Sequence, residues 1–232
     1  MPVKKYQGKV IDRQVIAKNT YYLKVQHPQN EQVSFLGGQF VNIEVQPNIR
    51  RSYSIASSPV YKDFIDLIAD SNGVGPGSLF FERAKVGDQV SYLGPLGLFV
   101  YKESNRPSYF FATGTGVVPF MSIMEYQLES LHATKSFKIF SSFRYREEVF
   151  GQEPFERFAG QYPNFGYILT VTKPDELWHG NKGRVSEFYQ AEIPDPNIDA
   201  YICGSHNSIM GIKEDLLKLG VPAQQIYYEK FY

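Results

Sequence analysis

The segment Arg51–Ser54, which reads RSYS, brings three kinds of ligand-binding side chain together within four positions. An arginine can clamp a phosphate group, a tyrosine ring can stack on a planar ligand, and a serine can hydrogen-bond to that ligand. Strand alternation places Arg51 and Tyr53 on one face and Ser52 and Ser54 on the other. We therefore expect this segment to bind a planar, phosphorylated molecule. The alternative is that Arg51 and Tyr53 are ordinary surface side chains.

Two glycine-rich segments each precede a predicted helix. Gly73–Ser78 reads GVGPGS, and Gly114–Pro119 reads GTGVVP at the first strand-to-helix turn of the second half. Free N–H groups at the start of a helix bind anions, and glycines let the ligand approach closely. In a doubly wound fold that first turn is where a pyrophosphate binds. The alternatives are a flexible loop with Ser78 as N-cap and a tight structural turn that lacks the GxGxxG pattern.

The single cysteine, Cys203, stands where a predicted strand runs into the small residues Gly204 and Ser205. One cysteine excludes an intramolecular disulfide, a structural CxxC zinc site and a four-cysteine iron–sulfur cluster. The four histidines are too scattered to form a metal site, so redox chemistry here requires a bound organic cofactor. A small buried side chain is the other interpretation of Cys203. The aromatic run Tyr227–Tyr232 is also compatible with a final strand packed into the core.

Composition narrows the class of protein. The chain has 232 residues, 43% of them hydrophobic, and its 24 Lys and Arg balance 24 Asp and Glu. This balance argues against a nucleic-acid-binding or polybasic membrane-binding protein. The N-terminus does not resemble a signal peptide, and the longest uncharged stretch, Pro107–Met124, is interrupted by glycines, prolines and hydroxyl residues. We expect a cytoplasmic protein without a membrane span.

The elements that must position these motifs divide the chain into two halves. Short β-rich runs with turn signals between them predict an antiparallel barrel or sandwich up to about residue 100, and strands alternating with helices predict a doubly wound parallel sheet after it. The polar stretch Lys102–Pro107 is the expected linker, so we predict domains at 1–102 and 107–232. The predicted strands are Val10–Ile16, Tyr21–Val25, Gln39–Val45, Ser52–Ala56, Phe64–Ala69 and Gln89–Leu93, then Tyr109–Ala112, Phe137–Ser142, Phe165–Val171, Ala200–Cys203 and Gln225–Tyr228; the predicted helices are Ser78–Ala84, Val117–Leu131, Pro154–Phe158, Ser186–Tyr189 and Asn207–Leu219.

The order and spacing of the motifs together are more specific than any one of them. RSYS, a glycine-rich helix start, GPLGLF at 94–99, ATGTGVVP at 112–119, ICG at 202–204 and a terminal aromatic follow one another along nearly the whole chain. In the order and spacing of these motifs the sequence resembles the ferredoxin–NADP reductase superfamily. Within that superfamily it is most similar to the short bacterial reductases without a fused iron–sulfur domain. The resemblance implies an N-terminal six-stranded antiparallel FAD-binding barrel followed by a doubly wound NAD(P)-binding α/β domain.

The resemblance also implies residue roles in the FAD site. Arg51 would contact the FAD pyrophosphate, Tyr53 the isoalloxazine ring, and Ser54 the flavin N5. Gly77 and Ser78 would hold the pyrophosphate from the helix start. The remaining expected contacts with FAD are Ser52 in the same motif and Ile68, Ala69 and Asp70 beside the ribityl chain.

Further roles are implied for the nicotinamide. Thr115 would lie between flavin and nicotinamide, with Gly114 and Gly116 allowing close approach, and Cys203 and Gly204 would flank the nicotinamide. Tyr232, or Phe231 in its place, would cover the flavin and move aside for the nicotinamide. The catalytic residues implied are Ser54, Thr115, Cys203 and Tyr232, and no metal ligand is expected.

The implied reaction is hydride transfer from NADPH to FAD, followed by single-electron transfer to ferredoxin or flavodoxin. Basic residues near Arg144 and Arg184 favour NADPH, while Glu147 and Glu148 leave NADH possible. Residues 1–51 carry eight Lys and Arg and three Asp and Glu, a net charge of +5, which suits an acidic partner.

Three alternatives remain at this point. They are an NAD(P)H:flavin reductase, the reductase component of an oxygenase, and a non-enzymatic nucleotide-binding subunit. The ending EKFY favours a bound flavin over a diffusible one.

Overall fold

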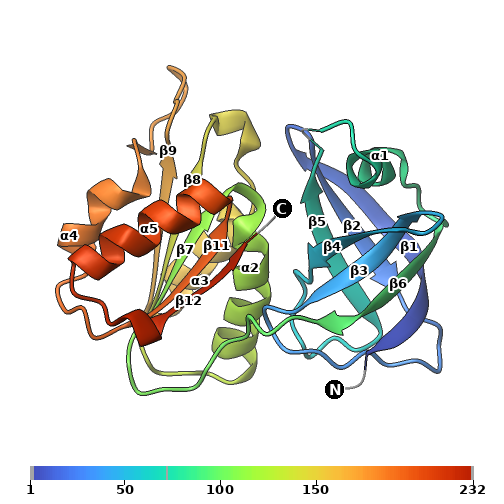
Figure 1. Ribbon diagram of the computed structural model, residues 1–232, viewed down its shortest axis with the longest axis horizontal. Helices are drawn as coiled ribbons and strands as arrows, with labels where there is room; N and C mark the ends of the chain where they lie inside the picture. The colour runs from blue at the N-terminus through green and yellow to red at the C-terminus, as the bar shows by residue number, and fades with distance from the viewer. Residues whose placement is uncertain (1–2, 72, 231–232) are drawn as a thin grey trace. The chain divides into compact units, whose positions relative to one another are not determined.

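The computed structural model describes residues 3–71 and 73–230. The chain divides into two compact units, drawn in Figure 1. One unit comprises the chain up to Tyr101 together with Val118–Leu131, and the other comprises Lys102–Val117 and the chain from His132 onward.

The first unit is built on a six-stranded antiparallel sheet in the order β4-β3-β6-β1-β2-β5. A bridge between Ile55 and Leu67 joins the two edges of this sheet, as a closed barrel requires. The helix α1 (Pro76–Arg83) follows β5. The expected barrel is thus confirmed. Its strands are β1 (Lys4–Ala17), β2 (Thr20–Gln26), β3 (Phe40–Gln46), β4 (Ile49–Ser54), β5 (Phe64–Asp70) and β6 (Gln89–Leu96).

Alternation along the strands builds the core of the barrel. In β1, Tyr6, Gly8 and Val10 are buried while Gln7 and Lys9 are exposed, so strand periodicity begins at Lys4. The predicted start at Val10 was too late, because lysines and a glycine conceal the alternation in β1. The inward side chains form one buried cluster that includes Leu23, Val41, Ile43, Leu67, Phe81 and Tyr92. Burying each such side chain contributes about 1.5–3 kcal/mol.

The second unit is a six-stranded parallel sheet in the order β10-β9-β8-β7-β11-β12. Helices lie on both faces. Phe111 and Phe140 belong to a core cluster with Ile209 of α5, whereas Phe165 on β9 stacks against Phe155 of α3. The expected doubly wound fold is confirmed. Its elements are β7 (Ser108–Thr113), β8 (Phe137–Phe143), α3 (Gln152–Gln161), β9 (Phe165–Val171), β10 (Asn181–Lys182), α4 (Tyr189–Glu192), β11 (Asp199–Gly204), α5 (His206–Lys218) and β12 (Ile226–Lys230), with short 3₁₀ turns at Gly114–Val117, Arg146–Glu148, Val185–Phe188 and Ala223–Gln225.

The predicted helix Val117–Leu131 is not uniform. It consists of α2 (Val118–Met124) followed by a π-helical turn, η2 (Glu125–Ser130). Ser122 in α2 donates a hydrogen bond of 2.7 Å to the carbonyl oxygen of Ser57. Among the described residues, no helix combines the length and the apolarity needed to cross a bilayer.

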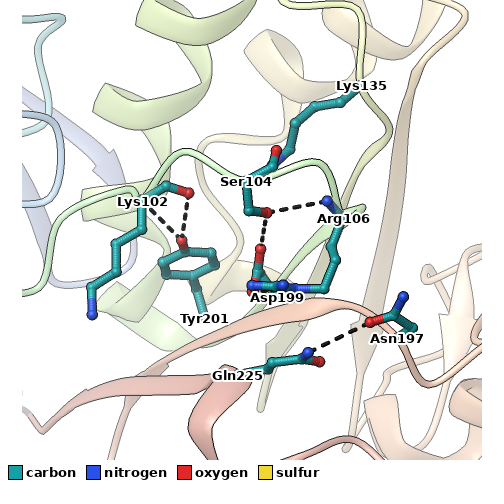
Figure 2. A network of polar contacts seen from close by, with 8 residues as sticks. All are labelled: Lys102, Ser104, Arg106, Lys135, Asn197, Asp199, Tyr201 and Gln225. Carbon is teal, nitrogen blue, oxygen red and sulfur yellow. Dashed lines mark hydrogen bonds and ion pairs between the residues drawn. The ribbon is translucent and has the colours of Figure 1, made fainter.

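A polar network holds the predicted linker against the second sheet (Figure 2). Asp199, at the start of β11, is only 1% exposed and accepts hydrogen bonds from Arg106 Nε and Nη2 at 3.0 and 2.7 Å. Ser104 also donates to this carboxylate, and the Tyr201 hydroxyl accepts from the Lys102 backbone N–H at 3.0 Å. A buried carboxylate needs such partners, so the network keeps residues 102–106 beside the amino end of β11.

Candidate functional site

The RSYS motif forms the end of β4, beside the first turn of α1. The Tyr53 ring packs on Phe81 of α1 with 4.7 Å between ring centroids, and burial raises the pKa of its hydroxyl to about 12 despite the nearby Arg51. Ser52 points toward β3, because its hydroxyl donates a hydrogen bond to Asn42 Oδ1 at 2.7 Å. Tyr53 is therefore a neutral, half-buried aromatic side chain held rigidly by its neighbours.

Gly77 lies against Arg51 and Tyr53, and these three residues are called the cradle below. A Cβ on Gly77 would collide with the Tyr53 hydroxyl and lie 3.4 Å from Arg51 Cγ. The N-cap of α1 is Gly75, with Pro76 in the first turn and no side-chain cap, so Ser78 does not cap the helix. As the N-cap, Gly75 supplies no side-chain oxygen to the first N–H groups of α1, which suits an anion site at a helix start.

Ser54 is 5% exposed, and within the described residues its hydroxyl has no hydrogen-bond partner. A buried hydroxyl without a partner is costly, so an external acceptor or donor suits this position. Ser54 pairs with Phe40 of β3. Together with the cradle, this orphaned hydroxyl fits a bound FAD, which carries both a pyrophosphate and a polar ring system. On β5, Ile68 and Ala69 are buried, whereas Asp70 is exposed.

In the second unit, the carboxyl ends of β7 and β11 meet with very little space between them. Gly204 adopts a φ of 148°, and a Cβ there would collide with the Thr113 hydroxyl. A Cβ on Gly116 would collide with the Cys203 carbonyl oxygen and lie 2.8 Å from Gly204 Cα. These glycines thus let the turn after β7 lie directly against the end of β11. Gly114 also has a positive φ, of 55°, while Thr115 is half-buried in the 3₁₀ turn.

The Thr113 hydroxyl at this edge is buried and has no hydrogen-bond partner in the described residues. Ligands of open parallel sheets bind outside the carboxyl ends of the strands. The close-packed glycines and the unsatisfied hydroxyl fit a nicotinamide nucleotide there. Thr113 was not among the predicted site residues, although it begins the TGTG run.

Cys203 is 1% exposed, and burial, with a smaller effect of Glu229, raises the pKa of its thiol well above its usual value. It is therefore a neutral thiol and no nucleophile. Glu229 pairs with Cys203 across β11 and β12, and burial raises the pKa of its carboxyl group to about 7. Sequence reasoning missed Glu229; the available signal was one acidic residue within an aromatic final strand.

Basic side chains gather at the carboxyl ends of β8, β9 and β10. The chain after β9 runs beside the chain after β8, because the Lys173 N–H donates to the Arg144 carbonyl oxygen at 2.8 Å. Arg184 lies just beyond β10, whose Lys182 pairs with Val171. Within the described residues, the side chains of Arg144, Lys173, Lys182 and Arg184 form no ion pair with an acidic side chain. This edge therefore carries positive charge available to an anion. Tyr232, predicted as the flavin cover, lies outside the described residues, as does its alternative Phe231.

Comparison with protein families identifies both units. Residues 7–101 match the oxidoreductase FAD-binding domain, and residues 110–214 match the oxidoreductase NAD-binding domain. Ferredoxin–NADP reductase B of Sorangium cellulosum is 30% identical over 214 residues, which cover 85% of each chain. The chain belongs to the ferredoxin–NADP reductase superfamily. Its cofactors are accordingly FAD and a nicotinamide nucleotide, as the resemblance implied.

Other members of the superfamily are similar over nearly the whole chain. The electron transfer component of toluate 1,2-dioxygenase from Pseudomonas putida is 28% identical over 97% of this chain and 67% of its own length. An Amycolatopsis cytochrome P450 reductase has the same fold, with a TM-score of 0.90 over 99% of this chain and 70% of its own, at 20% identity.

Proposed function

We propose that this protein is an FAD-dependent NADPH reductase that passes electrons singly to a small acceptor protein, such as a ferredoxin or a flavodoxin. The observation that carries the proposal is the cradle of Arg51, Tyr53 and Gly77 at the start of α1, within a chain that also has an NAD-binding domain. The chemistry that FAD supplies when bound is acceptance of a hydride and release of electrons one at a time.

The residues of the first unit hold FAD in this proposal. Arg51 and the N–H groups at the start of α1 neutralise the pyrophosphate, and Gly77 lets this helix start lie directly against Tyr53 and Arg51. Tyr53 lies against the flavin because its ring is fixed on Phe81 and its hydroxyl stays neutral. The Ser54 hydroxyl, which has no partner within the described residues, forms a hydrogen bond with the polar edge of the flavin. Ser52, Ser78, Ile68, Ala69 and Asp70 are proposed to line the same site.

The residues of the second unit hold the nicotinamide nucleotide. Gly114, where a Cβ would meet no atom within 4 Å, allows close approach of the nucleotide, while Gly116 and Gly204 let the turn after β7 lie against the end of β11. Thr113, Thr115 and Cys203 form the polar surroundings of these strand ends. No protein acid or base is required for hydride transfer, which agrees with a thiol that stays protonated. Arg144 and Arg184 are the proposed partners of the 2′-phosphate. Tyr232 is proposed as the aromatic cover of the flavin.

An acceptor protein needs a surface close to the flavin. Leu36 and Leu98 are 48% and 93% exposed, and Gln39 connects their loops: its Oε1 accepts from the Leu36 N–H at 2.9 Å, and its Nε2 donates to the Gly97 carbonyl at 3.3 Å. The Gln39 carbonyl accepts the N–H of Ile55, the residue after Ser54. Two exposed leucines thus stand on a rigid loop pair next to the proposed flavin contact. We infer that they form the apolar centre of the acceptor interface.

A second candidate function is the reductase component of an oxygenase, in which the acceptor is an oxygenase or its ferredoxin. The similarity to the toluate dioxygenase component along 97% of this chain favours it. The reduction of the flavin is the same in both cases, and only the acceptor differs.

The decisive experiment is an absorbance spectrum of the purified protein, followed by anaerobic titration with NADPH and then with NADH. A flavin spectrum that NADPH bleaches at lower concentration than NADH would support the proposal. Protein that binds no flavin, or that oxidises NAD(P)H only with added free flavin, would refute it in favour of a flavin reductase. Ferredoxin, flavodoxin and an oxygenase component would then be compared as acceptors.

A further inference from the structure

One ion pair stands among the cations at the carboxyl edge of the second sheet. Arg146, after β8, donates from Nε to both carboxylate oxygens of Asp175, after β9, at 3.0 Å each. The two side chains are 40% and 50% exposed, so a ligand can reach both. Two backbone hydrogen bonds hold these segments together, from Thr172 to Phe143 at 2.9 Å and from Lys173 to Arg144 at 2.8 Å. These bonds hold the bases of the two loops together and so bring Asp175 and Arg146 to the same edge of the sheet.

Asp175 differs from the neighbouring carboxylates in what it binds. Glu148 accepts a hydrogen bond from the Tyr145 N–H at 3.2 Å, and Glu187 accepts one from the Arg184 N–H at 3.0 Å. These two glutamates cap the 3₁₀ turns at their own segments. Asp175 instead pairs with the guanidinium of Arg146, which could otherwise bind a phosphate.

We propose that Asp175 is a specificity-determining residue that disfavours the 2′-phosphate of NADPH and favours the free 2′-hydroxyl of NADH. This inference rests on the proposed nicotinamide-dependent function. A carboxylate accepts a hydrogen bond from a ribose hydroxyl but repels a phosphate dianion. Asp175 thereby opposes Arg144 and Arg184, and its pairing with Arg146 withdraws one cation from the phosphate. The chain then accepts both nucleotides with a smaller preference than its basic residues alone would give.

The opposite role would be that Asp175 orients Arg146 so that its remaining N–H groups bind the phosphate. The two roles predict opposite effects of removing the charge. If Asp175 competes with phosphate, Asp175→Asn strengthens phosphate binding. If Asp175 positions Arg146 for phosphate, the same substitution weakens it.

The test is calorimetric titration of the purified protein with adenosine 2′,5′-bisphosphate and with adenosine 5′-monophosphate, which requires no flavin and no turnover. We expect Asp175→Asn to increase the preference for the bisphosphate by about tenfold, the size of effect that one removed charge gives near a dianion. The matched control is Glu176→Gln, an exposed carboxylate at the next position, which should change the preference by less than about twofold. In the double variant Asp175→Asn with Arg146→Gln, most of the gain should disappear.

The outcomes separate the inference from the function on which it rests. An unchanged or reduced preference for the bisphosphate in Asp175→Asn, with both nucleotides still bound, would overturn the role of Asp175 and leave the reductase in place. If the unmodified protein bound neither nucleotide, the proposed function and this inference would both be refuted.

Discussion

Glu229 and Cys203 lie side by side on neighbouring parallel strands, and the carboxyl group of Glu229 has a pKa of about 7 because it is buried. One oxygen of this carboxyl group is buried and has no hydrogen-bond partner among the described residues. A carboxyl group that holds its proton near neutral pH can donate one hydrogen bond and accept another. That combination matches a carboxamide, the polar group of nicotinamide.

We predict that Glu229 makes nucleotide binding pH-dependent. Below pH 7 the carboxyl group is protonated and can donate a hydrogen bond, and above pH 7 its charge repels the anionic nucleotide. The Kd for NADP⁺ should therefore rise as the pH passes through 7, and this rise should be absent in Glu229→Gln. Flavin absorbance changes during NADP⁺ titration at pH 6, 7 and 8 measure this. Glu214→Gln, on the exposed Glu214–Lys218 pair of α5, serves as control. An inflection retained in Glu229→Gln would assign the titration to another group.

Substitution of Gly77 should weaken FAD binding selectively. The Cβ of Gly77→Ala would displace the Tyr53 hydroxyl and narrow the cradle beside Arg51. We expect the Kd of the apoprotein for FAD, measured by flavin fluorescence, to rise by at least about tenfold, equivalent to about 1.4 kcal/mol. Gly75→Ala is the matched control, because a Cβ there meets no atom within 4 Å. Equal losses in the two variants would mean that helix stability, and not the cradle, determines FAD affinity.

Local patterns in the sequence predicted most of the fold. Short alternating runs identified the barrel strands, and the change to strand–helix alternation identified the parallel sheet. The two-residue strand β10 carries no periodicity and was missed. The alternative that Ser78 caps the helix is wrong, and Pro76 was the better signal for the helix start because proline favours the first turn.

The candidate site was less accessible to sequence reasoning. RSYS and the glycine turns are contiguous in the chain, so residue type and spacing identified them. The pairing of Glu229 with Cys203 depends on the register of two parallel strands joined by a helix, which no local pattern specifies. The Asp175–Arg146 pair likewise joins two loops that follow different strands. Local sequence patterns therefore did not predict the contacts between residues that are distant in the chain and meet only in the folded protein.

Leu98 should matter for the acceptor and not for the flavin. Leu98→Ser removes the most exposed part of the Leu36–Leu98 surface, so we expect kcat/KM for ferredoxin-mediated cytochrome c reduction to fall by about tenfold. Reduction of ferricyanide, a small acceptor that needs no docking surface, should stay unchanged. Val86→Ser is the control, because Val86 is also exposed, at 65%, on a separate turn of the same unit. A parallel fall in both activities would show that Leu98 acts on the flavin site instead.

His27 should make the barrel unit sensitive to acid. The imidazole is 5% exposed, with the Tyr92 hydroxyl 2.9 Å from Nδ1, and burial lowers its pKa from 6.5 to about 4 in spite of Asp63. The unfolded chain therefore binds a proton at His27 between pH 6.5 and 4, while the folded chain does not. Its contribution to stability is complete above pH 6.5 and is lost as the pH falls through 4.

Urea unfolding at pH 7.5 and pH 5 measures this contribution. We expect the free energy of unfolding to fall by about 1–2 kcal/mol more in the unmodified protein than in His27→Gln, which has no imidazole to protonate. His179→Gln, at an exposed position between β9 and β10, should leave the pH dependence as it is. If His27→Gln kept the full pH dependence, the acid sensitivity would have to come from carboxylates that are ionised in the folded state, because their protonation destabilises a protein in the same direction.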